Sequence, residues 1–310
     1  ALDTILLNDQ TTELALDRHQ QEFLEDPADT LRINDILSGQ APAFQPMQQD
    51  VLNMGHTDSS AWLHLRVASG MQDSHQHNWL LQLTFPLLER VDIFTVRNGT
   101  LLQQNQIGYS VPMHERPVRH RFFVHPLQVE PGETLDIYLN IMRKSGAVQA
   151  PLIISTPTAF LFAETSSNHV MGIYFGIMIA MIMYNFFLLF SVGNRSYFYY
   201  IVYITFTILT FQTFTGYGYL FLWPGQPWLN PYVTQIGAVM AIISGILFAR
   251  HFVKFERYVP WMQPLSSGMI ALGAVLLAAR LFTDEFLSLE ISAYCGVAVT
   301  VLPALIFVCW

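Results

Sequence analysis

Residues 170–190 read VMGIYFGIMIAMIMYNFFLLF, a stretch that is apolar nearly throughout and contains no Asp, Glu, Lys, Arg or His. About 20 residues at a rise of ~1.5 Å each cross the ~30 Å hydrocarbon layer of a bilayer, so this stretch predicts a membrane-spanning helix. The sequence before it has the composition of a water-soluble domain, whereas the sequence after it is almost entirely apolar. The chain therefore divides at this helix into two parts.

The charges divide at the same place. The residues before Val170 include ten Lys and Arg against nineteen Asp and Glu, and the remaining residues include five against four. An acidic first part is a poor partner for nucleic acid, whose phosphates require a basic surface. The two cysteines, Cys295 and Cys309, lie in the last apolar segment, which excludes a disulfide framework or a cysteine zinc site in the first part.

Period-two alternation in the first part predicts β-strands. Residues 63–67 read LHLRV and residues 135–141 read LDIYLNI, with an apolar residue at every second position. Asn98-Gly99 separates two strand-like runs and favours a type I′ hairpin turn. We predict eight or so short strands over residues 1–156 and an all-β, jelly-roll sandwich.

Two readings are open for residues 157–169, which connect the predicted sandwich to the first span. Thr156-Pro157 has the pattern of a helix start, and the helix could continue into the membrane. Alternatively, residues 165–167 form a flexible hinge.

The second part predicts a helical bundle over residues 170–310. Residues 196–249 contain no charged residue and must hold two spans. Arg195 and the loop 250–257 contain four Lys and Arg, so the positive-inside rule makes these turns cytoplasmic and places the first part outside. The expected spans are 170–192, 196–215, 231–249, 265–282 and 290–310.

Both ends of the sequence suggest a longer protein. Residue 1 is not Met and no leader is present, so we expect any signal peptide to have been removed. The last predicted span has no polar flank after Trp310, so we expect further spans or a cytoplasmic domain to follow.

Several stretches together resemble one family. They are LRINDILSG (31–39), NMGHTDSSAWLHLRV (53–67), WLLQLTFPLLERVDIF (79–94), ERPVRHRFFVHPL (115–127), PGETLDIYLNI (131–141) and GIYFGIMIAMIMYNFFLLFSVGNRSYFYYIVYI (172–204). In this order they resemble the bacterial seven-transmembrane receptors with diverse intracellular signalling modules, in the version with the type 2 extracellular domain. The resemblance implies a carbohydrate-binding-like jelly roll in the periplasm, seven helices in the inner membrane, and a cytoplasmic histidine kinase or diguanylate cyclase.

The charge-dense segment 114–121 gives the candidate ligand contacts. Arginine forks recognise carboxylates, so Arg116, Arg119 and Arg121, with His120, could line a cleft for an acidic sugar or a carboxylate. The alternative is a loop that is paired internally with acidic neighbours. Trp62 could stack on a sugar ring, although its strand pattern also fits a core position.

His75 and His77 lie on one face of an extended segment and could hold a metal ion, but no third ligand is near in sequence, and a solvated loop is the alternative. Acidic residues of the first part could supply oxygen ligands to calcium or another divalent ion, without the spacing of an EF-hand.

The predicted spans lack titratable groups in their interiors, which speaks against a membrane protease or a proton-coupled transporter. We therefore predict no catalytic residue in the chain. The residues that could pack or hydrogen-bond between helices are Gly172, Gly176, Asn185, Gln212 and Gln235.

Together these patterns predict an inner-membrane receptor that senses a periplasmic small molecule, glycan or ion, lies among membrane lipids, and pairs with a second copy or another receptor. The alternative is a membrane-anchored carbohydrate-binding or scaffold protein without signalling output.

Overall fold

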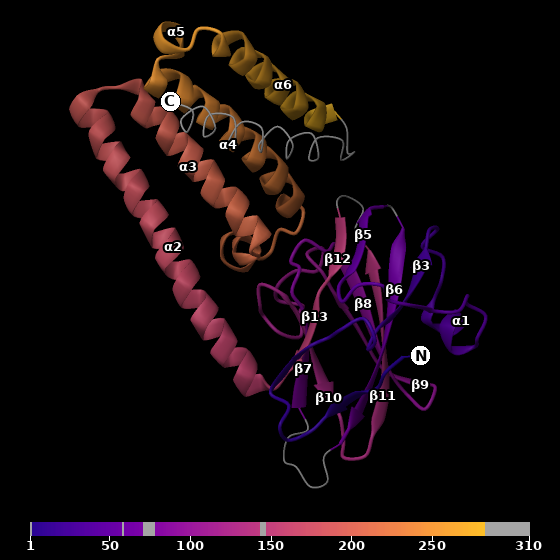
Figure 1. Cartoon of the computed structure of the whole chain (residues 1–310). Helices are drawn as coiled ribbons and strands as arrows, with labels where there is room; N and C mark the ends of the chain where they lie inside the picture. Colours follow the sequence, from indigo (N-terminus) through magenta and orange to yellow (C-terminus); the bar gives the residue numbers. More distant parts are fainter. Residues whose placement is uncertain (1, 58, 71–77, 143–146, 283–310) are drawn as a thin grey trace. The chain divides into compact units, whose positions relative to one another are not determined.

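The computed structural model describes residues 2–57, 59–70, 78–142 and 147–282 (Figure 1). The chain forms two compact units. We call Ala1–Ser167 with Thr215–Pro227 the strand unit, and Asn168–Phe214 with Trp228–Trp310 the helical unit. A β-rich region followed by a helical region confirms the predicted fold class.

The larger sheet of the strand unit has seven strands, and β1 pairs with β6 outside the main strand order β4-β3-β6-β11-β8-β9. Its strands are β1 (Ile5–Leu7), β3 (Glu22–Asp26), β4 (Gln45–Pro46), β6 (Ser60–Ser69), β8 (Arg90–Arg97), β9 (Thr100–Ile107) and β11 (Thr134–Met142). The three most central strands, β6, β11 and β8, are antiparallel neighbours.

A second sheet has the order β10-β7-β13-β2, and two further strands pair with each other. The second sheet contains β2 (Glu13–Ala15), β7 (Asn78–Leu83), β10 (Phe123–Gln128) and β13 (Leu152–Ser155); the separate pair is β5 (Leu52–His56) and β12 (Ala147–Ala150). There are more strands than predicted because the two- and three-residue strands are too short to show alternation.

One hydrophobic core joins the two main sheets. Alternate residues of β6 and β11, such as Leu65 and Ile137, are fully buried in it together with Trp79 and Leu81 of β7. Because successive side chains in a strand point to opposite faces, the alternation read from the sequence identifies the inward face of these strands.

The β8–β9 hairpin is confirmed. Asn98 and Gly99 have φ angles of 49° and 77°, the left-handed values that a type I′ turn requires at both central positions.

The outer face of the larger sheet bears a second small core. The helix α1 (Ile33–Leu37) and the segment after it cover Leu24, Trp62 and Phe94. This end of the sheet is therefore buried on both faces.

The helical unit begins within α2 (Pro157–Val192), a single helix of 36 residues that runs through Ser166-Ser167 without a break. It continues with α3 (Arg195–Phe214), α4 (Leu229–Val253), α5 (Phe255–Tyr258) and α6 (Met262–Phe282). α2 and α4 are long and apolar enough to cross a membrane, with mean hydropathies of 2.1 and 1.9. None of the apolar window of α2 is buried, unlike the core helix of a soluble protein.

Helices α3 and α6 lie at two further expected spans, 196–215 and 265–282. The fifth expected span, 290–310, lies outside the described residues.

Candidate functional site

The charge-dense segment 114–121 lies between β9 and β10. Arg116, His120 and Arg121 are buried there, whereas Arg119 is exposed. Charged side chains are rarely buried without partners, so the groups around these three residues define what the segment does.

The Arg116 guanidinium lies between two aromatic rings. Its Cζ is 4.9 Å from the ring centroid of Phe123 and 4.7 Å from that of Tyr219. Nη2 donates a hydrogen bond to the Gly108 carbonyl at 2.7 Å, and Nε donates to the Val111 carbonyl at 3.4 Å. Burial lowers the pKa of Arg116 to about 10, so the guanidinium remains charged at neutral pH.

Tyr219 comes from a distant segment of the chain. It belongs to Thr215–Pro227, which connects α3 and α4 but folds as part of the strand unit; we call this segment the docked loop. The Tyr219 hydroxyl donates to the Val111 carbonyl at 2.8 Å, and the Met113 N–H donates to the Pro224 carbonyl at 3.1 Å. Tyr219 lies within Gly218–Leu222, which forms one π-helical turn, a rare conformation that is frequent at functional sites.

Gly216 permits the close approach of the docked loop. Its φ angle is +78°, and a Cβ at this position would lie 2.5 Å from the Arg121 carbonyl oxygen and 3.1 Å from the Pro86 Cβ. A side chain is therefore excluded both by the backbone conformation and by the neighbouring backbone.

Arg121 and His120 hold the first turns of α2. Arg121 Nη2 lies 2.8 Å from Glu164 Oε1 and 2.9 Å from Ser167 Oγ, and His120 Nε2 lies 2.9 Å from Glu164 Oε2. Burial raises the pKa of Glu164, but the hydrogen bonds from His120 and Arg121 outweigh it and lower this pKa to about 2. The Arg121 guanidinium also lies 5.0 Å from the ring centroid of Tyr217 in the docked loop.

We call the set Arg116, His120, Arg121, Glu164, Tyr217 and Tyr219 the junction cluster. It brings together the β9–β10 loop, the start of α2 and the docked loop, all within the strand unit. The start of α2 and the docked loop each continue into a membrane helix. The cluster therefore fastens the strand unit to both segments that connect it to the helices. Its chemistry is charge-assisted hydrogen bonding and cation–π contact.

Sequence reasoning found the cationic half of this cluster and missed the aromatic half. The aromatic half comes from Gly216-Tyr217-Gly218-Tyr219, far along the chain from the charged segment. Its alternating glycines next to aromatic rings were the available signal, because glycine marks close backbone approach.

Trp62, the predicted sugar-stacking residue, is only 1% exposed and stacks on Phe94 with 5.6 Å between ring centroids. Next to it, the His64 ring stacks on Tyr138 at 4.5 Å, and His64 Nε2 lies 2.8 Å from Asp136 Oδ1. Burial raises the pKa of Asp136, but hydrogen bonding, from His64 among others, lowers it below its usual value. Both Trp62 and His64 are thus packed into the second core region.

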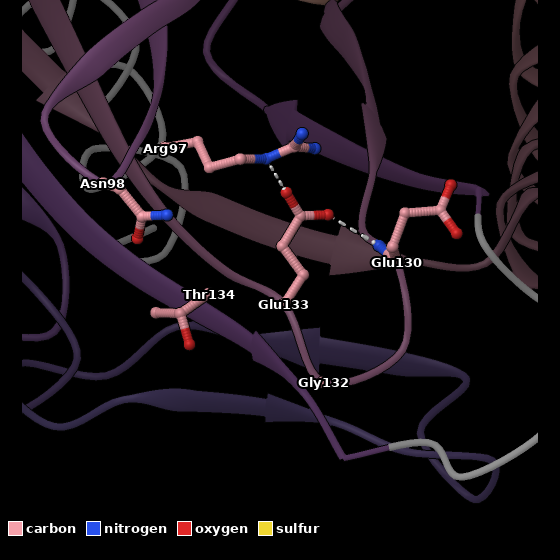
Figure 2. A pocket seen from close by; sticks show the side chains of 6 residues that line it. All are labelled: Arg97, Asn98, Glu130, Gly132, Glu133 and Thr134. Atoms are coloured by element: carbon pink, nitrogen blue, oxygen red, sulfur yellow. Dashed lines mark hydrogen bonds and ion pairs between the residues drawn. The ribbon is translucent and has the colours of Figure 1, made fainter.

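An open pocket of about 410 Å³ lies between the β8–β9 and β10–β11 turns (Figure 2). Its central carboxylate, Glu133, pairs with Arg97 Nε and accepts a hydrogen bond from the Glu130 N–H at 2.8 Å. Both oxygens of the Glu133 carboxylate are therefore paired within the protein.

The predicted metal residues His75 and His77 lie outside the described residues. Among the residues that are described, no group of three or more His, Cys, Asp or Glu could hold a metal ion.

The predicted helix-packing residues occupy different surroundings. A Cβ at Gly172 or Gly176 would meet no described atom within 4 Å. Asn185 donates to the Met181 carbonyl of its own helix at 2.8 Å. Gln235 is buried, and its Oε1 has no hydrogen-bond partner in the described part of the chain. Gln212 on α3 is partly buried.

The close α3–α4 contact is instead at Gly237, where a Cβ would lie 2.6 Å from Thr210 Oγ1. Small residues allow this approach between membrane helices.

The chain thus combines a β-rich region with apolar helices that are long enough to cross a membrane. Residues 18–156 match the family described as 7TMR-DISM extracellular 2, and residues 167–310 match 7TM diverse intracellular signalling. The chain belongs to the 7TMR-DISM family of seven-transmembrane receptors.

No curated protein matches the chain in sequence. Among solved structures, a match is the insecticidal delta-endotoxin Cry8Ea1 of Bacillus thuringiensis, with 14% identity and a TM-score of 0.23. It covers 35% of this chain and 19% of the toxin chain, and so low a TM-score supports no argument.

Proposed function

We propose that the chain is the sensor and membrane part of a bacterial inner-membrane receptor. Its strand unit, a carbohydrate-binding-like jelly roll, lies in the periplasm and changes the packing of the helices when a ligand binds. The helices pass the change to a cytoplasmic histidine kinase or diguanylate cyclase, as part of a two-component or cyclic-dinucleotide pathway. The four basic residues at Arg195 and in the loop 250–257 support this orientation.

The docked loop is the observation that carries the proposal. A segment between two membrane helices folds with the strand unit and contributes Tyr217 and Tyr219 to its buried cations. A protein that needed only an anchor would require one connection to the membrane. Two connections let a change in the strand unit act on α2 and on the α3–α4 pair together, which a simple anchor would not require.

The ligand is proposed by class only. A periplasmic small molecule, glycan or ion, or the strand unit of a second receptor, could bind the exposed surface; of the predicted cationic contacts, Arg119 is the accessible one. A ligand shifts the receptor only if it binds the two helix packings with different affinity. A divalent ion at His75 and His77 is retained as a further proposal.

The test uses the full-length receptor in cells and measures the phosphorylation or cyclic dinucleotide made by its output module. Gly216→Ala places a methyl group against the Arg121 backbone, so we expect loop release and a change in basal output of several fold. Gly225→Ala is the matched control, because Gly225 lies in the same loop with nothing within 4 Å of an added Cβ. Equal output from the two variants would favour the alternative, a membrane-anchored carbohydrate-binding or scaffold protein.

A further inference from the structure

The turn between α4 and α6 in the helical unit contains a basic pocket that the receptor function does not use. α4 ends where Lys254 adopts a left-handed conformation, with φ 53° and ψ 61°, and the short helix α5 follows directly. A pocket of about 490 Å³ opens at this turn, lined among others by Arg250, Lys254, Arg257 and Glu256.

The positive charge of this pocket is not neutralised within the described part of the chain. Arg250 Nη1 donates to Ser267 Oγ at 3.2 Å, a neutral partner, and no ion pair involves Arg250, Lys254 or Arg257 there. The single carboxylate, Glu256, accepts a hydrogen bond from Gln263 Nε2 at 3.1 Å. The lining of the pocket therefore contains three cations, Arg250, Lys254 and Arg257, and one carboxylate, Glu256.

Exposed aromatic residues mark the depth of the pocket in the membrane. Phe252, Tyr258 and Trp261 are 68%, 64% and 59% exposed and flank the basic residues along the chain. Tyr and Trp rings concentrate at the membrane–water interface, and α4 is apolar up to this turn. The cations consequently lie where phospholipid head groups lie.

We propose that this pocket binds the phosphate of an anionic phospholipid, such as phosphatidylglycerol, from the leaflet that surrounds the end of α4. The head-group phosphate contacts Arg250, Lys254 and Arg257, and the acyl chains lie along the apolar surface of α4. Arginine forks suit the phosphate oxygens, and the lysine adds a point charge. The site does not depend on the signalling role.

The experiment is native mass spectrometry of the full chain in neutral detergent, with phosphatidylglycerol or phosphatidylcholine added. We expect preferential retention of phosphatidylglycerol, reduced about fivefold by Lys254→Gln, as for the loss of one basic contact at a membrane surface. The triple change Arg250→Gln, Lys254→Gln and Arg257→Gln should bring retention to the phosphatidylcholine level.

The matched control is Arg195→Gln, which removes an exposed cation at the start of α3, outside the pocket. The end of α4 lies beside this end of α3, since the Tyr199 and His251 rings are 4.7 Å apart. Arg257→Lys keeps the charge and should keep binding, which separates a lost contact from misfolding. An equal effect of Arg195→Gln and Lys254→Gln, or equal retention of the two lipids, would overturn the proposal. Displacement of the lipid by millimolar inorganic phosphate would overturn the assignment to a lipid and assign a free anion.

Discussion

At the residue scale, the strand unit contains a buried histidine between its sheets. His125 of β10 is 0% exposed, and its Nδ1 lies 3.2 Å from Asn105 Nδ2 of β9. Burial lowers the pKa of His125 from its ordinary 6.5 to about 4, so the folded protein keeps the ring neutral where the unfolded chain is already protonated.

This histidine predicts acid sensitivity. Because the pKa is lower in the folded state, its contribution to stability is complete above pH 6.5 and is lost as the pH falls toward 4, by about 3 kcal/mol. Thermal unfolding of wild type and His125→Gln between pH 7 and 4 should show a shallower pH dependence in the variant. Parallel curves would show that His125 does not titrate as described.

Arg116 predicts a different kind of sensitivity. Arg116→Met keeps much of the side-chain volume but removes the charged hydrogen bonds to the Gly108 and Val111 carbonyls, at a cost of about 1–3 kcal/mol of unfolding free energy. The two carbonyls keep their other donors, the Val111 N–H and the Tyr219 hydroxyl. Arg119→Met, an exposed change three residues away, should stay within about 0.5 kcal/mol. Thermal unfolding of the full chain compares the two, and equal losses would contradict the contacts assigned to Arg116.

At the element scale, α2 predicts that helix continuity matters. We expect insertion of Gly-Gly-Ser-Gly between Ser166 and Ser167 to disconnect the output, because flexible residues interrupt the helix. Four alanines at the same place keep a helix and turn its continuation by about 400°, close to one full turn. They should preserve more output in the same cellular assay, and an identical effect of both insertions would exclude transmission along α2.

The elements that the sequence predicted well are those governed by local rules. Alternation identified the inward faces of β6 and β11, and Asn98-Gly99 identified a turn whose φ angles only such residues adopt easily. Sequence reasoning left the continuity of α2 open, since Thr165, Ser166 and Ser167 have no strong helix preference of their own. The packing of the flanking turns, including the contacts of Glu164, cannot be predicted from the local sequence pattern.

Half of the junction cluster could be predicted for the same reason. The density of charge at 114–121 is visible in the sequence, but its partners are distant: Glu164 lies 43 residues from Arg121, and Tyr219 lies about 100 residues from Arg116. No period or spacing connects residues so far apart. The second core under α1 was likewise missed, because a strand buried on both faces at one end does not alternate cleanly.

At the scale of the whole molecule, the chain is a receptor whose strand unit includes the docked loop, the segment that connects α3 and α4. The boundary between its parts therefore does not fall at one position in the sequence. One boundary lies in α2 after Ser167, and two more lie at the ends of the docked loop, before Thr215 and after Pro227. Truncation at residue 156 would remove both Glu164 and the docked loop, leaving Arg116 and Arg121 buried without these partners.

The most direct test of this account is hydrogen–deuterium exchange at the Met113 amide of the full-length receptor in lipid nanodiscs, because this N–H bonds only to the docked loop in the described structure, through the Pro224 carbonyl. The account predicts slow exchange in wild type and in Gly225→Ala, and exchange at least tenfold faster in Gly216→Ala. Fast exchange in the wild type, or the same rate in both glycine variants, would contradict the docking of the loop.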